Sequence, residues 1–264
     1  AMKQYRFNDA SGAVFDWFWS DFCDWYVEAS KLSLYSGDGD EKNRAASVLL
    51  YVLEEGLRLL HPFISFITEE LYSKLPVDGD ASVRIADSVI TAPYPRVRPE
   101  REAPDLDASF TTLQEAVRLV RTMRSEFTIP PSRRIRLHIR VGQSLAAGGL
   151  LERQRTLISS LCSADSLEID ESRPDTDGAV TLVGTGFEVY AWVRDLIDIE
   201  KETAKLEKQL AGARKQLEST DKKLSNEKFL AKAGDDVVAH ERSKREELVE
   251  KVKKLEGYIA DLGR

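Results

Sequence analysis

Arginines are concentrated in residues 110–140, and their chemistry suits the binding of phosphate groups. This stretch holds seven basic and two acidic residues. Three arginines recur every third residue, which keeps them on one broad face of a helix, and others follow closely. A guanidinium donates hydrogen bonds in a planar fork that fits phosphate oxygens, so this surface could contact a nucleic acid. The candidate residues are Arg118, Arg121, Arg124, Arg134 and Arg136.

A second interpretation of these arginines is a solvated face that pairs with carboxylates. Residues 1–109 carry 11 basic and 19 acidic residues, whereas residues 110–194 carry 11 and 10. The net charge of −7 therefore arises in the first part of the chain, which could supply those carboxylates. The sequence leaves both interpretations open.

Lysines form a second candidate set in the last part of the chain. They cluster around an expected turn, and we choose Lys222, Lys223, Lys228 and Lys232 as candidates for RNA contact. An ammonium on a flexible stem contacts phosphate without needing a defined orientation. Residues 195–264 hold 16 basic and 16 acidic residues, however, and charged flanks are usual for coiled coils. A solvated helix flank is thus an equally simple interpretation.

Motifs of catalysis and cofactor binding do not occur in the sequence. We find no P-loop, dinucleotide-binding fingerprint, zinc-protease motif or nucleophile elbow. The three histidines fall in three different segments, and Cys23 and Cys162 lack the spacing of a metal site. We therefore expect no catalytic residue, no metal and no cofactor in these residues. Unpaired cysteines and the lack of an 18-residue apolar run predict a cytoplasmic protein with no membrane partner.

The elements that would position these residues fall into four segments. Residues 3–90 show helical periodicity, with one long aromatic-rich helix to about Tyr35 and a second helix broken at Pro62. We expect Trp17, Phe18, Phe22 and Trp25 to be core residues rather than surfaces for stacking bases. Residues 91–108 contain four prolines and few large apolar residues, which predicts an extended connector.

Residues 109–193 predict a small α/β module. A helix is expected over 110–127, and residues 134–141 alternate in the manner of a half-exposed strand, with Arg134, Arg136, His138 and Arg140 on the polar side. A short helix over 150–161 and a strand near 167–169 follow. Strands over 180–183 and 187–193 are expected to form a hairpin through Gly184-Thr185-Gly186.

Residues 194–264 predict an antiparallel coiled-coil hairpin. One seam of mostly apolar residues runs from Ile199 to Leu224 and a second from Val238 to Leu262, with the polar Glu241 and Arg245 in the second seam. The turn would lie within 225–236. The fold class is therefore mainly α: a helical bundle, then a small mixed α/β domain, then the hairpin.

Several segments resemble those of bacterial valyl-tRNA synthetases. The resemblance covers nearly the whole chain, and a segment on the hairpin is the most discriminating. Ser65 and Tyr72 depart from the proline and tryptophan expected in that family. The segments are residues 6–10, 18–28, 60–63, 66–72, 120–126, 129–131 and 224–233.

The resemblance implies a role that the spacing of residues does not. It identifies residues 3–90 as part of an anticodon-binding bundle and 194–264 as a tRNA-binding arm. Such an enzyme joins valine to its tRNA with ATP and is expected to be monomeric. The ATP-binding motifs HIGH and KMSKS are absent from these 264 residues, so we expect a C-terminal fragment that binds tRNA without catalysis.

Two alternatives remain. One is the corresponding region of an isoleucyl- or leucyl-tRNA synthetase, which is not expected to end in this hairpin. The other is a scaffold or chaperone-like protein whose hairpin grips protein partners, for which Phe229, Leu230 and Val237 could provide apolar contacts.

Overall fold

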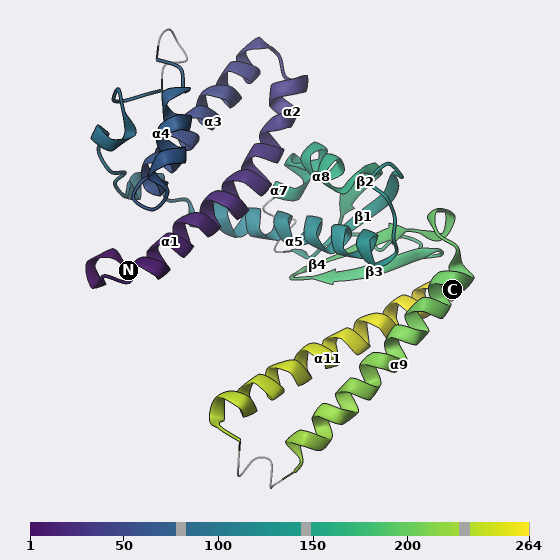
Figure 1. The fold of residues 1–264 in the computed structure, drawn as a ribbon. Helices are drawn as coiled ribbons and strands as arrows, with labels where there is room; N and C mark the ends of the chain where they lie inside the picture. Colours follow the sequence, from purple (N-terminus) through teal and green to yellow (C-terminus); the bar gives the residue numbers. More distant parts are fainter. Residues whose placement is uncertain (78–82, 144–148, 227–232, 264) are drawn as a thin grey trace. The chain divides into compact units, whose positions relative to one another are not determined.

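The chain forms two compact units, residues 1–102 and 103–264, in a computed structural model (Figure 1). The structure describes residues 1–77, 83–143, 149–226 and 233–263. Within these ranges, no helix combines the length and the apolar character that crossing a membrane requires.

The first unit is helical. Its main elements are α1 (Phe7–Asp16), the π-helix η2 (Trp17–Val27), α2 (Glu28–Ser36), α3 (Gly39–Leu60) and α4 (Ser65–Ser73). The short 3₁₀ turns are η1 (Met2–Gln4), η3 (Val89–Thr91) and η4 (Pro99–Arg101). The expected long first helix is present, but its middle is π-helical. Phe22 and Trp25 are buried as predicted, whereas Trp17 and Phe18 are only half-buried.

A buried ion pair holds α3 to the chain that follows α4. Glu54 and Arg58 lie one helical turn apart, and their side chains are joined by Nε–Oε1 and Nη2–Oε2 contacts of 2.9 and 2.8 Å. The Tyr72 hydroxyl donates to Glu54 at 3.2 Å, and Arg58 donates to the Pro93 carbonyl at 2.8 Å. These bonds satisfy the buried charges, which would otherwise be costly.

Residues 93–98 of the proline-rich segment have no regular secondary structure, and the segment is bonded to the rest of the first unit. Besides the bond to Pro93, Arg98 donates to Glu55 of α3 at 2.8 Å. Polar anchors thus hold a segment that has few apolar residues. Its last residues begin α5 (Pro104–Glu126), six residues earlier than predicted, because Pro104 suits the first turn of a helix and Asp105 and Asp107 favour its N-terminus.

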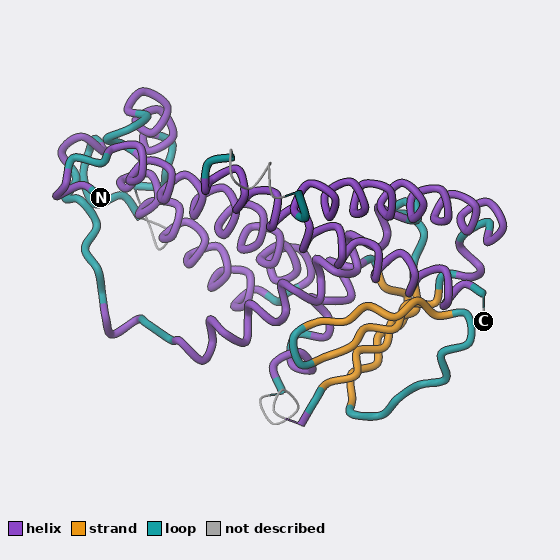
Figure 2. Tube along the Cα trace, turned by 90° about the horizontal axis from the view of Figure 1, so that it is seen from below, coloured by secondary structure: helices purple, strands orange, loops and turns teal. Residues whose placement is uncertain are grey.

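The second unit contains a four-stranded mixed sheet. Its strands are β1 (Ile135–Val141), β2 (Ala164–Asp170), β3 (Ala179–Gly184) and β4 (Phe187–Trp192), in the order β2-β1-β4-β3. β1 runs parallel to β2 and antiparallel to β4, and β3 pairs with β4 as the predicted hairpin. Helices α5, α7 (Leu150–Arg153) and α8 (Arg155–Cys162) belong to the same unit, and Figure 2 shows helices along one side of the strands.

β1 is a central strand, and one prediction about it is wrong. Ile135, Leu137 and Ile139 are buried as expected, but His138 on the opposite side is also buried, at 2% exposure. Its Nδ1 lies 3.3 Å from Glu168 Oε2, and its Nε2 lies 3.2 Å from the Ser172 carbonyl oxygen. The chain after β2 thus closes over this part of the polar face, which alternation within one strand could not reveal.

The arm consists of α9 (Ile199–Leu224) and α11 (Asp235–Leu262), which pack against each other (Figure 1). The predicted seams are confirmed at the buried positions Leu206, Leu210, Ala213, Leu248 and Leu255. Arg245 is an exception, because its side chain is 47% exposed and pairs with Asp221 at 2.6 Å. A guanidinium at a seam position is better solvated at the flank than buried.

The base of the arm is fastened to the module by both of its helices. Lys205 of α9 donates to the Glu126 carbonyl at 2.9 Å, and Lys254 of α11 contacts the Glu126 carboxylate at 2.8 Å. Asp261 of α11 accepts from the backbone N–H of Thr181 at 2.8 Å, which satisfies a donor of the edge strand β3. The arm is thus built into the second unit at its base.

Candidate nucleic-acid interface

Three of the candidate arginines converge at the turn between α8 and β2. Ser163 adopts a left-handed conformation (φ 52°), which ends α8 and starts the strand. The carbonyl groups around this turn accept from arginines that come from two other elements: Arg121 to Leu161 at 3.1 Å, Arg124 to Cys162 at 3.4 Å and Arg134 to Ala164 at 3.1 Å. We call Arg121, Arg124 and Arg134 the arginine corner.

The position of the corner has an electrostatic cause. The C-terminal end of a helix carries partial negative charge on carbonyl groups that lack partners within the helix. Cations therefore gather there without needing carboxylates. The carbonyls of Leu161, Cys162 and Ala164 hold the guanidinium groups in place, so their remaining donors have a defined direction.

Arg124 is a structural member of the corner rather than a surface residue. Its side chain is buried, at 6% exposure, and Nη2 donates to the carbonyls of Pro130 and Arg133 at 2.6 Å each. Burial lowers the pKa of this guanidinium from its ordinary value. The inclusion of Arg124 in an exposed face is therefore corrected: it supports the loop that carries Arg133 and Arg134. Periodicity could not separate it from Arg121, because both lie on the same side of α5.

The other candidates in this region are exposed. Arg118 and Arg121 lie on α5, Arg134 precedes β1, and Arg136 lies on β1. Among the ion pairs of the described residues, none includes Arg134 or Arg136. Arg136 instead lies over the Trp192 ring, 4.1 Å from its centroid. Arg134 and Arg136 thus carry positive charge that a backbone carbonyl and an aromatic ring orient but do not neutralise.

Two features near the corner differ from what the sequence indicated. Trp192 was not a candidate, because only the strand register places it beside Arg136. Arg140 lies in the same strand as Arg136, but its positive charge is paired with Glu188 at 3.2 Å. That carboxylate raises the pKa of Arg140. Cys162 lies beneath the corner, and burial raises the pKa of its thiol to about 12.

Lys222 and Lys223 have partners within the arm. Lys222 pairs with Glu218 at 2.5 Å and Lys223 pairs with Glu241 at 2.9 Å, and these contacts lower the pKa of both carboxyl groups. The Lys222 side chain is 74% exposed. Exposed pairs of this kind contribute little stability, so a phosphate could replace the carboxylate. Lys228 and Lys232, together with Phe229 and Leu230, lie outside the described residues.

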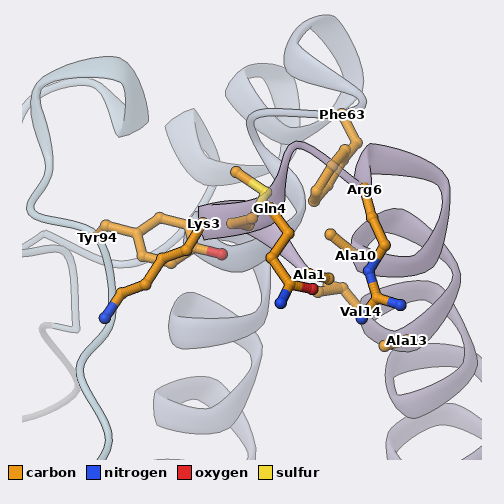
Figure 3. A pocket seen from close by; sticks show the side chains of 10 residues that line it. Ala1, Lys3, Gln4, Arg6, Ala10, Ala13, Val14, Phe63 and Tyr94 are labelled. Carbon is orange, nitrogen blue, oxygen red and sulfur yellow. The ribbon is translucent and has the colours of Figure 1, made fainter.

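The first unit has a pocket that the sequence did not indicate. It lies at the start of α1, and Figure 3 shows Lys3, Gln4 and Arg6 around it with the rings of Phe63 and Tyr94. Arg6 is paired with Asp9 at 3.3 Å. Within the residues that the structure covers, no group of His, Cys, Asp or Glu side chains is arranged to hold a metal ion.

Comparison with known proteins assigns both ends of the chain. The family model described as "Anticodon-binding domain of tRNA ligase" matches residues 1–139, and the one described as "Valyl tRNA synthetase tRNA binding arm" matches residues 198–263. The second match coincides with the hairpin of α9 and α11. The chain belongs to the valyl-tRNA synthetase family.

Relatives of the family match over almost the whole chain. The valine–tRNA ligase of Treponema denticola is 38% identical over 98% of this chain, and that of Geobacillus kaustophilus is 39% identical over 99%. The valine–tRNA ligase of Geobacter sulfurreducens is 40% identical over 95%. The chain spans 28–29% of the length of these relatives.

The family assignment decides between the alternatives left by the sequence. The resemblance to valyl-tRNA synthetases is confirmed, and the match to their arm disfavours the isoleucyl and leucyl families. It also disfavours an unrelated scaffold protein, because the anticodon-binding match extends over the other half of the chain. The arginine corner lies inside the first match, as does Arg136.

Proposed function

We propose that this chain is the tRNA-binding part of a valine–tRNA ligase, which attaches valine to its tRNA with ATP. The observation that carries the proposal is the joining of an anticodon-binding match to a tRNA-binding arm match in one chain. Exposed arginines inside the first match add a surface that suits a polyanion.

In this proposal the three parts have separate tasks. The first unit and α5 contribute contacts at the anticodon end of the tRNA. The arm contacts another part of the same molecule, with Lys222, Lys223, Lys228 and Lys232 as the candidate contacts. Arg118, Arg121, Arg134 and Arg136 bind phosphates of the same tRNA. Phosphate contacts position a nucleic acid and carry little sequence information, so we expect the chain to prefer valine tRNA only slightly.

The chain contributes binding rather than chemistry in this account. We expect no activation of valine, no metal and no cofactor bound by these residues, with ATP used elsewhere in the whole enzyme. The enzyme is proposed to act in the cytoplasm as a monomer. The expectation of no valine activation rests on the 264 residues, which contain neither ATP-binding motif of the family.

The test compares two activities of the purified chain. We expect saturable binding of labelled valine tRNA, displaced by unlabelled valine tRNA and almost equally by another tRNA. We expect valine-dependent exchange between ATP and pyrophosphate to stay at background. Exchange above background would overturn the assignment of a binding role alone, and a failure to bind any tRNA would overturn the proposed function.

A further inference from the structure

Carboxylates lie next to most of the basic side chains that β1 presents on the polar face of the sheet. On this face β1 presents Arg136, His138 and Arg140, and each faces a residue of β4 and one of β2. His138 lies within 3.3 Å of both Glu168 and Asp170, and Arg140 pairs with Glu188. Two of the three positions thus have carboxylate partners.

Arg136 is the exception in this row. Its cross-strand neighbours are Trp192 of β4 and Ser166 of β2, neither of which is charged. The guanidinium is exposed and lies 4.1 Å from the centroid of the half-buried Trp192 ring. A guanidinium that stacks on an aromatic ring is held in one orientation and keeps its positive charge.

The stacked pair offers two kinds of contact on one site. The flat guanidinium leaves an outer face on which a nucleobase can stack, and its N–H groups can donate to phosphate oxygens. Proteins that bind unpaired RNA commonly use aromatic rings and arginines on a sheet surface in this way. A ligand that carries only a carboxylate would pair with the positive charge of Arg136 but would gain nothing from its flat surface.

We propose that Arg136 and Trp192 form a stacking site for an unpaired nucleotide of the RNA that the arginine corner binds. The inference rests on the proposed function, because it assumes that RNA reaches this surface. Arg134 is two residues before Arg136 and donates a hydrogen bond to the Ala164 carbonyl. This bond places it to contact the sugar-phosphate backbone of the same RNA molecule.

The test uses the whole 264-residue chain and distinguishes the contribution of a flat side chain from that of positive charge. Arg136→Lys keeps the positive charge but removes the flat surface, and Arg136→Ala removes both. We expect each variant to bind labelled tRNA at least about fivefold more weakly than the wild type, since stacking of one base is worth that much or more. Arg140→Lys is the matched control, because it lies on the same strand and face but is paired with Glu188; its affinity should stay within twofold.

A blunt-ended RNA duplex without unpaired nucleotides provides the second comparison. There, Arg136→Lys should bind as the wild type does. Binding of tRNA by Arg136→Lys at wild-type strength would overturn the stacking site and leave a phosphate contact. An equal loss on tRNA and on the duplex would overturn it as well.

A direct readout of Trp192 in the wild-type chain does not depend on whether the variants fold. The chain is labelled with 5-fluorotryptophan, and the ¹⁹F resonance of Trp192 is assigned with Trp192→Phe. Addition of tRNA should shift this resonance, while the duplex should leave it nearly unchanged. An unmoved Trp192 resonance in a sample that binds tRNA would refute the inference but not the proposed function. If the wild type binds no tRNA, both fail.

Discussion

Replacement of Arg58 by Ala is expected to lower the free energy of unfolding of the first unit by about 3–5 kcal/mol. Arg58 is 6% exposed and Glu54 is 1% exposed, so removal of the guanidinium leaves a buried carboxylate without its partner. The hydrogen bond to the Pro93 carbonyl disappears as well, so residues 93–98 lose one of their polar anchors to α3 and keep the bond from Arg98 to Glu55. Denaturant unfolding followed by the fluorescence of Trp17, Trp19 and Trp25 measures the change.

Two further variants distinguish burial of a charge from simple removal of an ion pair. Lys31→Ala removes the exposed pair with Glu28 and should cost less than about 1 kcal/mol. The double variant Glu54→Gln/Arg58→Met carries no buried charge and should recover most of the stability that Arg58→Ala removes. If Arg58→Ala and Lys31→Ala have equal effects, the buried pair does not hold this unit together.

The double variant Arg121→Gln/Arg134→Gln is expected to weaken tRNA binding by about tenfold or more at low salt. One hydrogen bond to a charged group contributes about 1.5–3 kcal/mol, and a loss of about 1.4 kcal/mol already weakens binding tenfold. The slope of log affinity against log salt should become flatter by about 2, or about 1 for each arginine that no longer binds a phosphate. Fluorescence anisotropy of labelled tRNA at several salt concentrations gives both quantities.

The control for this variant removes the same charge from arginines that already have carboxylate partners. Arg140→Gln/Arg155→Gln breaks the pairs with Glu188 and Glu152, and tRNA affinity should change less than threefold. Cys162 reports on the fold of the corner, since its buried thiol should stay unreactive toward thiol reagents near pH 8 in every variant that folds. Equal decreases in affinity in the two double variants would mean that net charge, not the corner, governs binding.

The elements could be predicted where a single repeating pattern governs burial. The heptad spacing of Leu206, Leu210 and Leu255 identified the arm, because a two-helix hairpin has one seam and little else to bury. The hairpin of β3 and β4 followed from Gly184-Thr185-Gly186, and Gly186 has the positive φ (80°) that such a turn requires.

Other features depend on contacts between distant segments and could not be predicted. His138 looks solvent-facing in an alternating strand, but the chain near Ser172 covers it. Arg124 looks like a third surface arginine, but the carbonyls of Pro130, Arg133 and Cys162 enclose it. Trp192 becomes a partner of Arg136 only through the register of β4 on β1. In each case the deciding residue lies 6 to 56 positions away in the chain.

The central claim is that this chain binds tRNA through exposed, oriented cations, and the salt dependence of wild-type binding tests it most directly. Labelled tRNA is titrated with the chain at salt concentrations between about 50 and 200 mM. With roughly four phosphate contacts, we expect log affinity to fall linearly with log salt, with a slope of about −3 to −4. Affinity that does not change across this range, or the absence of binding at the lowest salt concentration, would contradict the account.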